Sequence, residues 1–431
     1  MLQLPKADPD IVNRKAEIVS ALRSIVSEVS AVIDKEDELR PFETDGLAAY
    51  RQMPLAVVLP STTEEIAAVL RYCNDKAVKV VARGAGTSLA GGALPLGDAV
   101  VLGVSKMTSI LDIDYDNRTA TVQAGVTNIN ITNAVSGDGF FYAPDPSSQL
   151  ACTIAGNIGM NSGGAHCLKY GVTTNNVLGL KVVLMDGSIV EFGGHHLDAN
   201  SYDLMGLFIG SEGMMGVVTE IVVRILRSPE GARPMLMGFK ANEDAGACVA
   251  SIIASGIIPV AIEFMDRPAI HAAENFTKAG YPLDVEAMLI IEVEGSDEEI
   301  DDQLERIKAI AKDFNPVSTK VSSNETESLA IWKGRKSAFG AVGQISPDYL
   351  CMDGTIPTSR LPEVLKGIQA ISDSYGLQVA NIFHAGDGNL HPLVLYNGNK
   401  AGELERVEEM GAEILQLCVD VGGCLTGEHG V

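Results

Sequence analysis

Three glycine-dense runs constrain the fold of this chain more than any other feature of its sequence. They are "RGAGTSLAGG" (83–92), "PDPSSQLACTIAGNIGMNSGGAHCLKYGVT" (144–173) and "GSEGMMGVVTE" (210–220). Glycine lets backbone N–H groups approach and surround an anionic ligand. Each run taken singly is explained equally well as a structural turn. The three together predict different walls of one large cofactor site.

The first run follows a segment with the pattern of a strand, a helix and a second strand, "PLAVVLPSTTEEIAAVLRYCNDKAVKVVARGAG" (54–86). Ser61 and Glu64 have the spacing of a capping box and predict the start of the helix. The run lacks the third glycine of G-x-G-x-x-G and the Gly-Lys-Ser/Thr ending of a nucleotide-triphosphate loop. Neither dinucleotide binding of the Rossmann type nor ATP hydrolysis follows from it.

Length and charge limit the classes of function. A chain of 431 residues exceeds what one hydrophobic core usually organises, so we expect two or three domains. The net charge of −24 disfavours nucleic acid and anionic membrane as partners, because both require basic surface. An anionic substrate would need a local basic pocket.

Cysteine usage and hydropathy bear on the compartment. The seven cysteines are scattered and form no C-x-x-C pair, which predicts neither a disulfide framework nor an iron–sulfur cluster held by this chain. No uninterrupted apolar run approaches the ~18 residues that span a bilayer, and the N-terminus lacks an apolar signal core. We therefore expect a cytoplasmic protein without a transmembrane segment.

The apolar pattern divides the chain into segments. Residues 10–35 have the spacing of one amphipathic helix, and several strands follow in a mixed-sheet region, one pair joined by an Asp-Gly hairpin at 186–187. Proline and glycine become frequent at 227–234, and a new alternation of strands and helices begins there. Ser296 and Glu299 predict a further capping box. The predicted segments are a helical N-terminus (1–50), a first domain (51–228) and a second domain with an antiparallel sheet (229–431).

Two histidines flank a glycine-rich turn in "NIFHAGDGNLHPLVLY" (381–396). His384 ends one predicted strand and His391 begins the next, and the simplest interpretation is a pair of ordinary polar residues at strand ends. The segment "CLTGEHGV" adds Glu428 and His429. Two imidazoles and one carboxylate are also the protein ligands of an open catalytic metal site, so both interpretations remain.

Six motifs in order resemble the FAD-linked 2-hydroxy acid dehydrogenase family, which includes glycolate oxidase D subunits, D-lactate dehydrogenases and D-2-hydroxyglutarate dehydrogenases. They are "AVVLPSTTEEIAAVLRYC", "RGAGTSLAGG", "TIAGNIGMNSGG", "KYGVT", "GSEGMMGVVTE" and "FHAGDGNLHP". The resemblance covers roughly residues 50–431. Within the family, "GRKSAFGAVGQISPDYLCMDGTIP" (334–357) is most similar to the glycolate oxidase D subunit.

The resemblance implies an α+β protein of the vanillyl-alcohol oxidase / p-cresol methylhydroxylase type. A two-subdomain FAD-binding domain would occupy residues 51–228, and an α+β cap domain with an antiparallel sheet would occupy residues 229–431. Relatives continue beyond the segment that matches "GEHGV", so the resemblance also implies an incomplete C-terminal domain and a C-terminally truncated chain.

By the same resemblance, the three glycine-dense runs bind FAD. Thr87 and Ser88 lie where some relatives carry a histidine attached to the flavin, so non-covalent binding is implied. The residues implied in FAD binding are Arg83, Gly84, Ala85, Gly86, Thr87, Ser88, Leu89, Gly91, Pro144, Asp145, Thr153, Gly156, Asn157, Asn161, Gly163, Glu212, Gly216 and Val218.

The family also implies a metal site and a reaction. His384, His391 and Glu428 would bind a divalent metal, Zn or Mn, and His429 would act as the base. The metal would lower the pKa of the substrate hydroxyl while hydride passes to flavin N5. In "WKGRKSAF" (332–339), Arg335 is the candidate clamp for the substrate carboxylate, and Lys333 and Lys336 are expected at the surface.

The implied function is oxidation of a small D-2-hydroxy acid, glycolate or D-lactate, to the 2-oxo acid. Cys351 stands where some hydroxyglutarate-oxidising relatives have lysine, which favours the smaller substrates. Two alternatives remain: a catalytically weak or inert flavin-binding subunit of a multi-subunit glycolate oxidase, and a flavin-free zinc hydrolase, which would leave the glycine runs unexplained.

Because the chain carries no cysteine cluster, an external acceptor must reoxidise the flavin. An iron–sulfur partner subunit, a quinone and an electron-transfer flavoprotein are the three candidates. Attachment to the inner membrane would then be peripheral and would occur through partner subunits.

Overall fold

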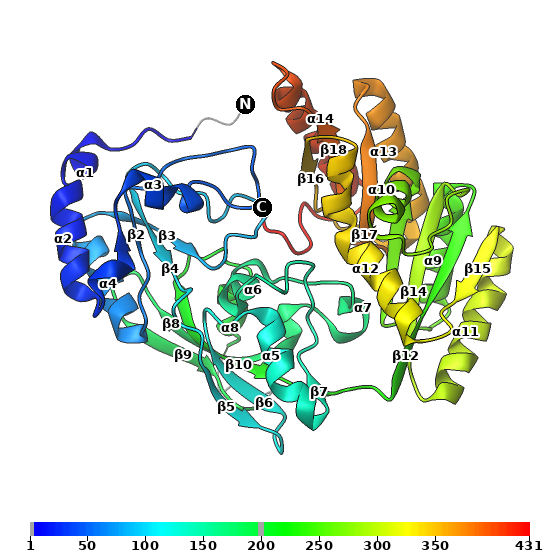
Figure 1. Cartoon of the computed structure of the whole chain (residues 1–431), viewed down its shortest axis with the longest axis horizontal. Helices are drawn as coiled ribbons and strands as arrows, with labels where there is room; N and C mark the ends of the chain where they lie inside the picture. The colour runs from blue at the N-terminus through cyan, green and yellow to red at the C-terminus, as the bar shows by residue number, and fades with distance from the viewer. Residues whose placement is uncertain (1–3, 197–201) are drawn as a thin grey trace. The chain divides into compact units, whose positions relative to one another are not determined.

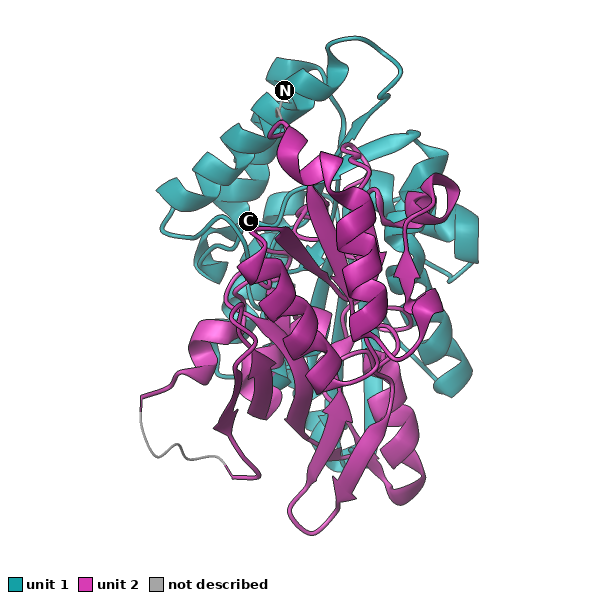
Figure 2. Cartoon of the chain, turned by 90° about the vertical axis from the view of Figure 1, so that its left-hand side faces the viewer, with its two compact units in different colours: residues 1, 164–170, 229–427 teal, residues 2–163, 171–228, 428–431 magenta. Residues whose placement is uncertain are grey.

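The computed structural model describes residues 4–196 and 202–431, which form two compact units (Figure 2). Unit 1 contains residues 164–170 and 229–427. Unit 2 contains the described residues up to 163 together with 171–228 and 428–431. None of the helices formed by the described residues is both long enough and apolar enough to cross a membrane.

The first sheet of unit 2 combines parallel and antiparallel pairing. β2, β4 and β3 are parallel, and β1 adds antiparallel to β2. Ile18 of α2 (Lys15–Ile25) and Ile66 of α4 (Thr63–Asp75) pack with Val58 and Leu102 in the core beside this sheet. In spatial order the strands are β1 (Val32–Ile33), β2 (Ala56–Val58), β4 (Ala99–Gly103) and β3 (Lys79–Arg83).

The prediction of one helix over residues 10–35 was wrong. The segment forms α1 (Pro9–Asn13) and α2, then a 3₁₀ turn (Val29–Ala31) and strand β1. The residues after Ile25 include valines, which favour strands, and serines, which favour caps and turns over the interior of a helix. Pairing of Val32 with Val58 adds sheet hydrogen bonds that a continued helix would lack.

The predicted capping box of α4 lies one residue later than expected. Thr62, not Ser61, is the N-cap, and its hydroxyl accepts a hydrogen bond from the Glu65 N–H at 3.2 Å. The Glu65 carboxylate accepts the backbone N–H of Ser61 at 2.7 Å. Ser61, Thr62 and Thr63 all carry hydroxyls, so the sequence offers three possible N-caps in a row.

The second sheet of unit 2 is fully antiparallel, so the mixture of strand directions lies in the first sheet. The predicted Asp-Gly hairpin is confirmed, with Gly187 at φ +81 between β8 and β9. Helices α5 (Asn128–Val135) and α6 (Ile154–Met160) contribute to the core beside the sheet. In order the strands are β5 (Ile110–Asp114), β6 (Thr119–Gln123), β10 (Val217–Arg224), β8 (Val177–Val183) and β9 (Ile189–Gly193).

Short elements complete unit 2. A two-stranded ribbon pairs β11 with β7 in antiparallel fashion. The elements are α3 (Glu36–Leu39), β7 (Phe140–Phe141), α8 (Met205–Phe208) and β11 (Leu226–Arg227).

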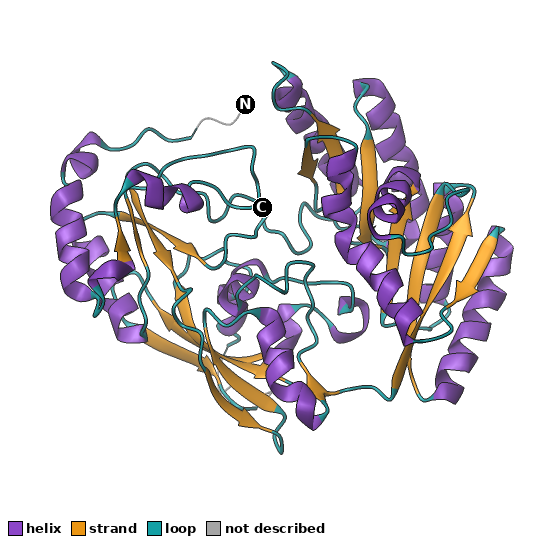
Figure 3. Cartoon of the chain, in the orientation of Figure 1, coloured by secondary structure: helices purple, strands orange, loops and turns teal. Residues whose placement is uncertain are grey.

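Unit 1 is built on one seven-stranded sheet whose neighbouring strands are all antiparallel, as predicted for the second domain (Figure 3). In order the strands are β15 (Ser318–Val321), β12 (Gly231–Phe239), β14 (Ala287–Gly295), β13 (Ala261–Asp266), β17 (Val379–His384), β18 (Pro392–Tyr396) and β16 (Asp348–Cys351).

Helices cover both faces of this sheet (Figure 1). Successive strand residues alternate between the two cores: Leu289 and Ile291 of β14 face one, and Met288 and Ile290 face the other. The first face packs against α9 (Asn242–Ala254), α11 (Asp297–Ala311), α13 (Leu361–Tyr375) and α14 (Glu403–Asp420). The second face packs against α10 (Arg267–Thr277) and α12 (Glu325–Ala341). The predicted Ser296–Glu299 capping box is confirmed at the start of α11.

Residues 164–170, here called the strap, belong to unit 1 although both flanking segments belong to unit 2. His166 Nε2 lies 3.0 Å from Glu292 Oε2 of β14, and the indole N–H of Trp332 donates to Glu292 Oε1 at 2.7 Å. Lys169 pairs with Glu294, and the Tyr170 hydroxyl, at the end of α7 (Cys167–Tyr170), donates to the same carboxylate. Two glutamates on one strand therefore hold the strap.

Candidate active site

All the residues predicted to bind FAD lie in unit 2, and the first glycine-dense run begins where β3 ends at Arg83. Among residues 84–92, only the backbone N–H of Ala90 donates a hydrogen bond within the described part of the chain, to Ser88 Oγ at 3.3 Å. The other backbone N–H groups of this loop are therefore available to an anionic ligand such as a pyrophosphate.

Glycine is required where this loop passes α6. A Cβ added to Gly84 would overlap the hydroxyl of Thr153 and lie 3.4 Å from Gly156 Cα. Thr153 is the N-cap of α6, and its hydroxyl accepts the Gly156 N–H at 3.2 Å. Gly86 has φ +72, the left-handed region that glycine tolerates best. The first and second glycine-dense runs are therefore in direct contact.

Arg83 holds the base of the loop. Its Nη1 donates to the carbonyl oxygens of Thr44 at 2.8 Å and Ala93 at 3.4 Å, and Nη2 donates to that of Pro41 at 3.4 Å. Its side chain is largely buried, and desolvation lowers the pKa of its guanidinium from the ordinary value. Arg83 therefore connects the start of the glycine loop to the backbone of residues 41, 44 and 93.

Amide side chains connect the second run. Asn128 Nδ2 donates to Pro144 O at 3.0 Å and to Asn157 Oδ1 at 3.2 Å. Asn161 caps the C-terminus of α6 at φ +53, and its Oδ1 accepts the Thr174 N–H at 2.9 Å. Asn157 and Asn161 thus shape the run through hydrogen bonds within the protein.

The third run meets the second through backbone and side-chain contacts. The Glu212 N–H donates to Gly159 O at 2.8 Å, and Glu212 has φ +55. A Cβ on Gly216 would lie 2.8 Å from Val182 Cγ1, which explains the glycine just before β10. Val218 follows within β10. The three runs therefore meet within unit 2, apart from residues 164–170 of the second run, which belong to unit 1.

Residues 428–431 pack on the same runs. A Cβ on Gly163 would lie 2.5 Å from Glu428 Oε2, and the Ser88 hydroxyl donates to the His429 carbonyl at 3.4 Å. The Val431 N–H donates to Glu212 Oε1 at 2.9 Å. Glu428 and His429 are thus placed beside the candidate FAD loops of their own unit.

Unit 1 carries the two histidines of the 381–396 stretch. His384 is the last residue of β17, and His391 precedes β18 by one residue, as predicted. The side chains are buried, at 6% and 2% exposure, and their rings are perpendicular with centroids 5.2 Å apart. One ring nitrogen of His384 lies within 4.8 Å of one ring nitrogen of His391. In the turn between them, Asp387 Oδ1 accepts the Asn389 N–H at 3.2 Å.

A buried carboxylate contacts His384. Glu263 of β13 is directly opposite His384 in the strand register, and its Oε1 lies 2.8 Å from His384 Nδ1. Arg335 of α12 is buried, at 2% exposure, and its Nε donates a hydrogen bond to Glu263 Oε2 at 2.7 Å. Its Nη2 lies 2.5 Å from the same oxygen in an ion pair without the alignment of a hydrogen bond. Burial raises the pKa of Glu263, but the charge of Arg335 and the contacts that Arg335 and His384 make with the carboxylate outweigh burial and hold that pKa below its usual value.

Arg335 therefore uses one edge of its guanidinium on Glu263, which leaves the Nη1 side for another acceptor. The neighbouring Lys333 and Lys336 are exposed, as predicted.

Asp353 approaches His391 and also anchors the chain just before Glu428. Asp353 Oδ1 lies 3.5 Å from His391 Nδ1, an ion-pair distance rather than a short hydrogen bond. Its Oδ2 accepts the Thr426 hydroxyl at 2.5 Å and the Gly427 N–H at 2.8 Å. A Cβ on Gly427 would lie 2.5 Å from Asn389 Cγ. Gly427 thus packs on the turn between the two histidines, and Glu428 is the next residue in the chain.

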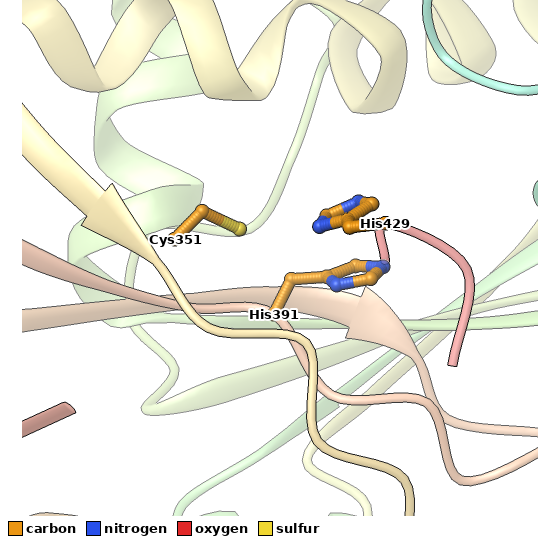
Figure 4. A group of neighbouring side chains, drawn as sticks. All are labelled: Cys351, His391 and His429. Carbon is orange, nitrogen blue, oxygen red and sulfur yellow. The ribbon is translucent and has the colours of Figure 1, made fainter. Parts of the chain in front are cut away.

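The sequence reasoning missed Glu263, Asp353 and the position of Cys351. The Cys351 Sγ lies within 4.8 Å of a ring nitrogen of His391, and Figure 4 shows both side chains. The signal for Glu263 was a single glutamate inside the apolar strand "AIEFMD" (261–266). Cys351 lies on β16, which pairs with β18, so its position beside His391 depends on a sheet pairing and not on a local pattern.

Two family models match this chain. The model described as "FAD linked oxidases, C-terminal domain" matches residues 228–431, and the model described as "FAD binding domain" matches residues 54–193. Glycolate oxidase subunit GlcD of Escherichia coli K12 is 48% identical over 429 residues, a match that covers 100% of this chain and 85% of that protein. This chain belongs to the FAD-linked oxidase family.

A further relative and two solved structures are also similar to this chain. The D-lactate dehydrogenase of Archaeoglobus fulgidus is 32% identical over 411 residues and covers 94% of this chain and 89% of its own length. The structure of p-cresol methylhydroxylase matches this chain with a TM-score of 0.80 at 16% identity, and the match covers 99% of this chain and 91% of the p-cresol methylhydroxylase chain. That of alkyldihydroxyacetonephosphate synthase has a TM-score of 0.76 at 17% identity, over 99% of this chain and 82% of its own. The predicted vanillyl-alcohol oxidase / p-cresol methylhydroxylase fold is thereby confirmed.

The residues of this FAD-linked oxidase fit the two groups that the sequence implies. Apart from Ala90, residues 84–92 have backbone N–H groups that donate no hydrogen bond within the described part of the chain, and a Cβ on Gly84 would overlap Thr153; such a loop suits a pyrophosphate-bearing cofactor such as FAD. Imidazoles with carboxylates beside Nδ1 are a donor set that Zn²⁺ accepts.

Proposed function

We propose that this FAD-linked oxidase oxidises a small D-2-hydroxy acid, glycolate or D-lactate, to the 2-oxo acid. The observation that carries the proposal is the buried pair of His384 and His391, each with a carboxylate beside Nδ1. The names of the E. coli and A. fulgidus relatives identify the two candidate substrates.

The proposed cofactor sites are those that the sequence implies. FAD would be held non-covalently by the glycine-dense runs of unit 2, and it supplies a two-electron acceptor for the hydride from the substrate Cα. His384, His391 and Glu428 would hold a divalent metal, which supplies a Lewis acid for the substrate hydroxyl. Support for the third ligand is the anchoring of Gly427 on Asp353 and Asn389, one residue before Glu428.

Two side chains would act on the substrate directly. His429 would take the hydroxyl proton, because a neutral imidazole is a suitable base near neutral pH. Arg335 would bind the substrate carboxylate through the guanidinium edge that Glu263 does not use. Lys333 and Lys336 are exposed and have no part in the proposal.

The electrons would then pass to an external acceptor. The E. coli relative is named as a subunit of glycolate oxidase, which favours a partner subunit as that acceptor. An iron–sulfur subunit is the form of partner that the sequence analysis suggests.

The test is a visible spectrum of the purified, FAD-loaded protein under anaerobic conditions. The flavin band near about 450 nm should bleach with glycolate or D-lactate and should not bleach with L-lactate. Absence of a flavin band after incubation with FAD would reject the proposal. A flavin band that no 2-hydroxy acid bleaches would favour the inert-subunit alternative.

Metal content of variants tests the ligand set in parallel. His384→Ala should lose the bound metal, because one of three proposed ligands is removed. His271→Ala is a matched control in the same unit, because the His271 ring forms a hydrogen bond with the Leu283 carbonyl at 3.0 Å and is not one of the proposed ligands. Equal metal content in the two variants would contradict the assignment.

A further inference from the structure

Glu263 is an unusual residue for the place it occupies. Its side chain has 0% exposure, and its neighbours along β13 are apolar. A carboxylate removed from water is costly unless charged groups and hydrogen bonds satisfy it. Glu263 has two such partners, Arg335 and His384, one for each oxygen.

The two partners of the Glu263 carboxylate have different roles: Arg335 balances its charge, and His384 is oriented by it. Arg335 at Oε2 supplies the compensating positive charge. Oε1 therefore serves as a fixed acceptor for the Nδ1–H of His384 at 2.8 Å. An imidazole that donates from Nδ1 keeps its lone pair on Nε2, the atom that would face a metal.

The strand register makes this arrangement rigid. Glu263 and His384 are directly opposite residues on β13 and β17, so their side chains leave the sheet on the same face. Arg335 reaches them from α12, which packs on that face. The corresponding contact of His391 with Asp353 is longer, at 3.5 Å, and Asp353 also binds Thr426 and Gly427. The contact of His384 with its carboxylate is thus the shorter of the two.

We propose that Glu263 is a positioning residue for metal binding: it fixes the tautomer and the direction of the His384 ring, while Arg335 neutralises its charge. This inference rests on the metal site of the proposed function. Arg335 would then have two roles, to neutralise Glu263 and to bind the substrate carboxylate.

The test measures Mn²⁺ affinity of the FAD-loaded protein by the electron paramagnetic resonance signal of free Mn²⁺, which flavin absorbance does not disturb. Removing Glu263 alone would leave Arg335 buried without its partner and lower stability. The informative variant is therefore the apolar double substitution Glu263→Leu with Arg335→Met. We expect its dissociation constant for Mn²⁺ to rise by about 10- to 100-fold.

Two further variants separate positioning from a merely structural role. Glu263→Gln with Arg335→Met restores an acceptor oxygen opposite His384 and should recover part of the lost affinity. Asp266→Asn alters another buried carboxylate of β13, which accepts hydrogen bonds from Ala269 and Asn381 rather than from His384. Asp266→Asn should keep the wild-type Mn²⁺ affinity even if it unfolds at a lower temperature.

The outcomes distinguish this inference from the proposed function. Wild-type affinity in the Glu263→Leu, Arg335→Met variant would overturn the positioning role and leave the metal site intact, provided that His384→Ala loses the metal. A wild-type protein that binds neither Mn²⁺ nor Zn²⁺ would overturn the metal part of the proposed function, and the positioning role with it.

Discussion

At the scale of single residues, Gly84 shows how one hydrogen atom in place of a methyl group shapes the proposed cofactor site. A Cβ at this position would overlap the Thr153 hydroxyl and approach the Gly156 backbone. Gly84→Ala should therefore separate the first glycine-dense run from α6 and weaken FAD binding by on the order of tenfold, because overpacking costs about 1–3 kcal/mol.

The recovery of flavin fluorescence on dilution measures that FAD affinity. Gly137→Ala is the matched control, since a Cβ there would meet no atom within 4 Å. If Gly84→Ala bound FAD as tightly as Gly137→Ala, the close contact between the loop and α6 would not matter for the cofactor.

At the scale of elements, the strap is held by one strand. Glu292 accepts from the Trp332 indole and contacts His166, and the His166 and Trp332 rings lie 5.2 Å apart. Glu292→Leu should release the strap and expose the indole to water. Because Trp332 is the single tryptophan, its emission should move to longer wavelength and its quenching by acrylamide should increase.

Glu286→Gln serves as the control for the strap, since Glu286 pairs with exposed Arg267 just before β14. Its tryptophan emission should match that of the wild type. Unchanged emission in Glu292→Leu as well would show that the strap does not depend on Glu292.

Local patterns were sufficient for most elements near the site. They failed where a partner lies far away in the sequence and where adjacent residues can serve equally well as a helix cap. The strand before the first glycine run, the Asp-Gly hairpin and the Ser296 cap all follow from neighbouring residues. The role of Glu263 depends on the register of β13 against β17, more than a hundred positions apart in the chain, which no local pattern specifies. The N-cap of α4 was misplaced because adjacent hydroxyls compete for the same N–H groups.

At the scale of the whole molecule, each unit has cores of its own. Residues on both faces of the seven-stranded sheet form the cores of unit 1, and different clusters form beside the two main sheets of unit 2. Urea should therefore unfold the chain with two midpoints, one from Trp332 emission for unit 1 and one from flavin release for unit 2. Added FAD should raise the midpoint of flavin release and leave the Trp332 midpoint unchanged.

The Gly84→Ala variant gives an internal check on this unfolding experiment, because it should lower the flavin midpoint alone. Coincident midpoints at every FAD concentration would show instead that the two units unfold as one cooperative body.

The packing of residues 428–431 on Ser88, Gly163 and Glu212 has a consequence for biosynthesis. A ribosome makes the glycine-dense runs of unit 2 first and then the 199 residues from 229 to 427, which belong to unit 1. At about 5–20 residues per second, at least some ten seconds separate the third glycine run from the tetrapeptide that packs on it. In a nascent chain, residues 428–431 can therefore pack on the glycine-dense runs of unit 2 only after residues 229–427 of unit 1 have been synthesised.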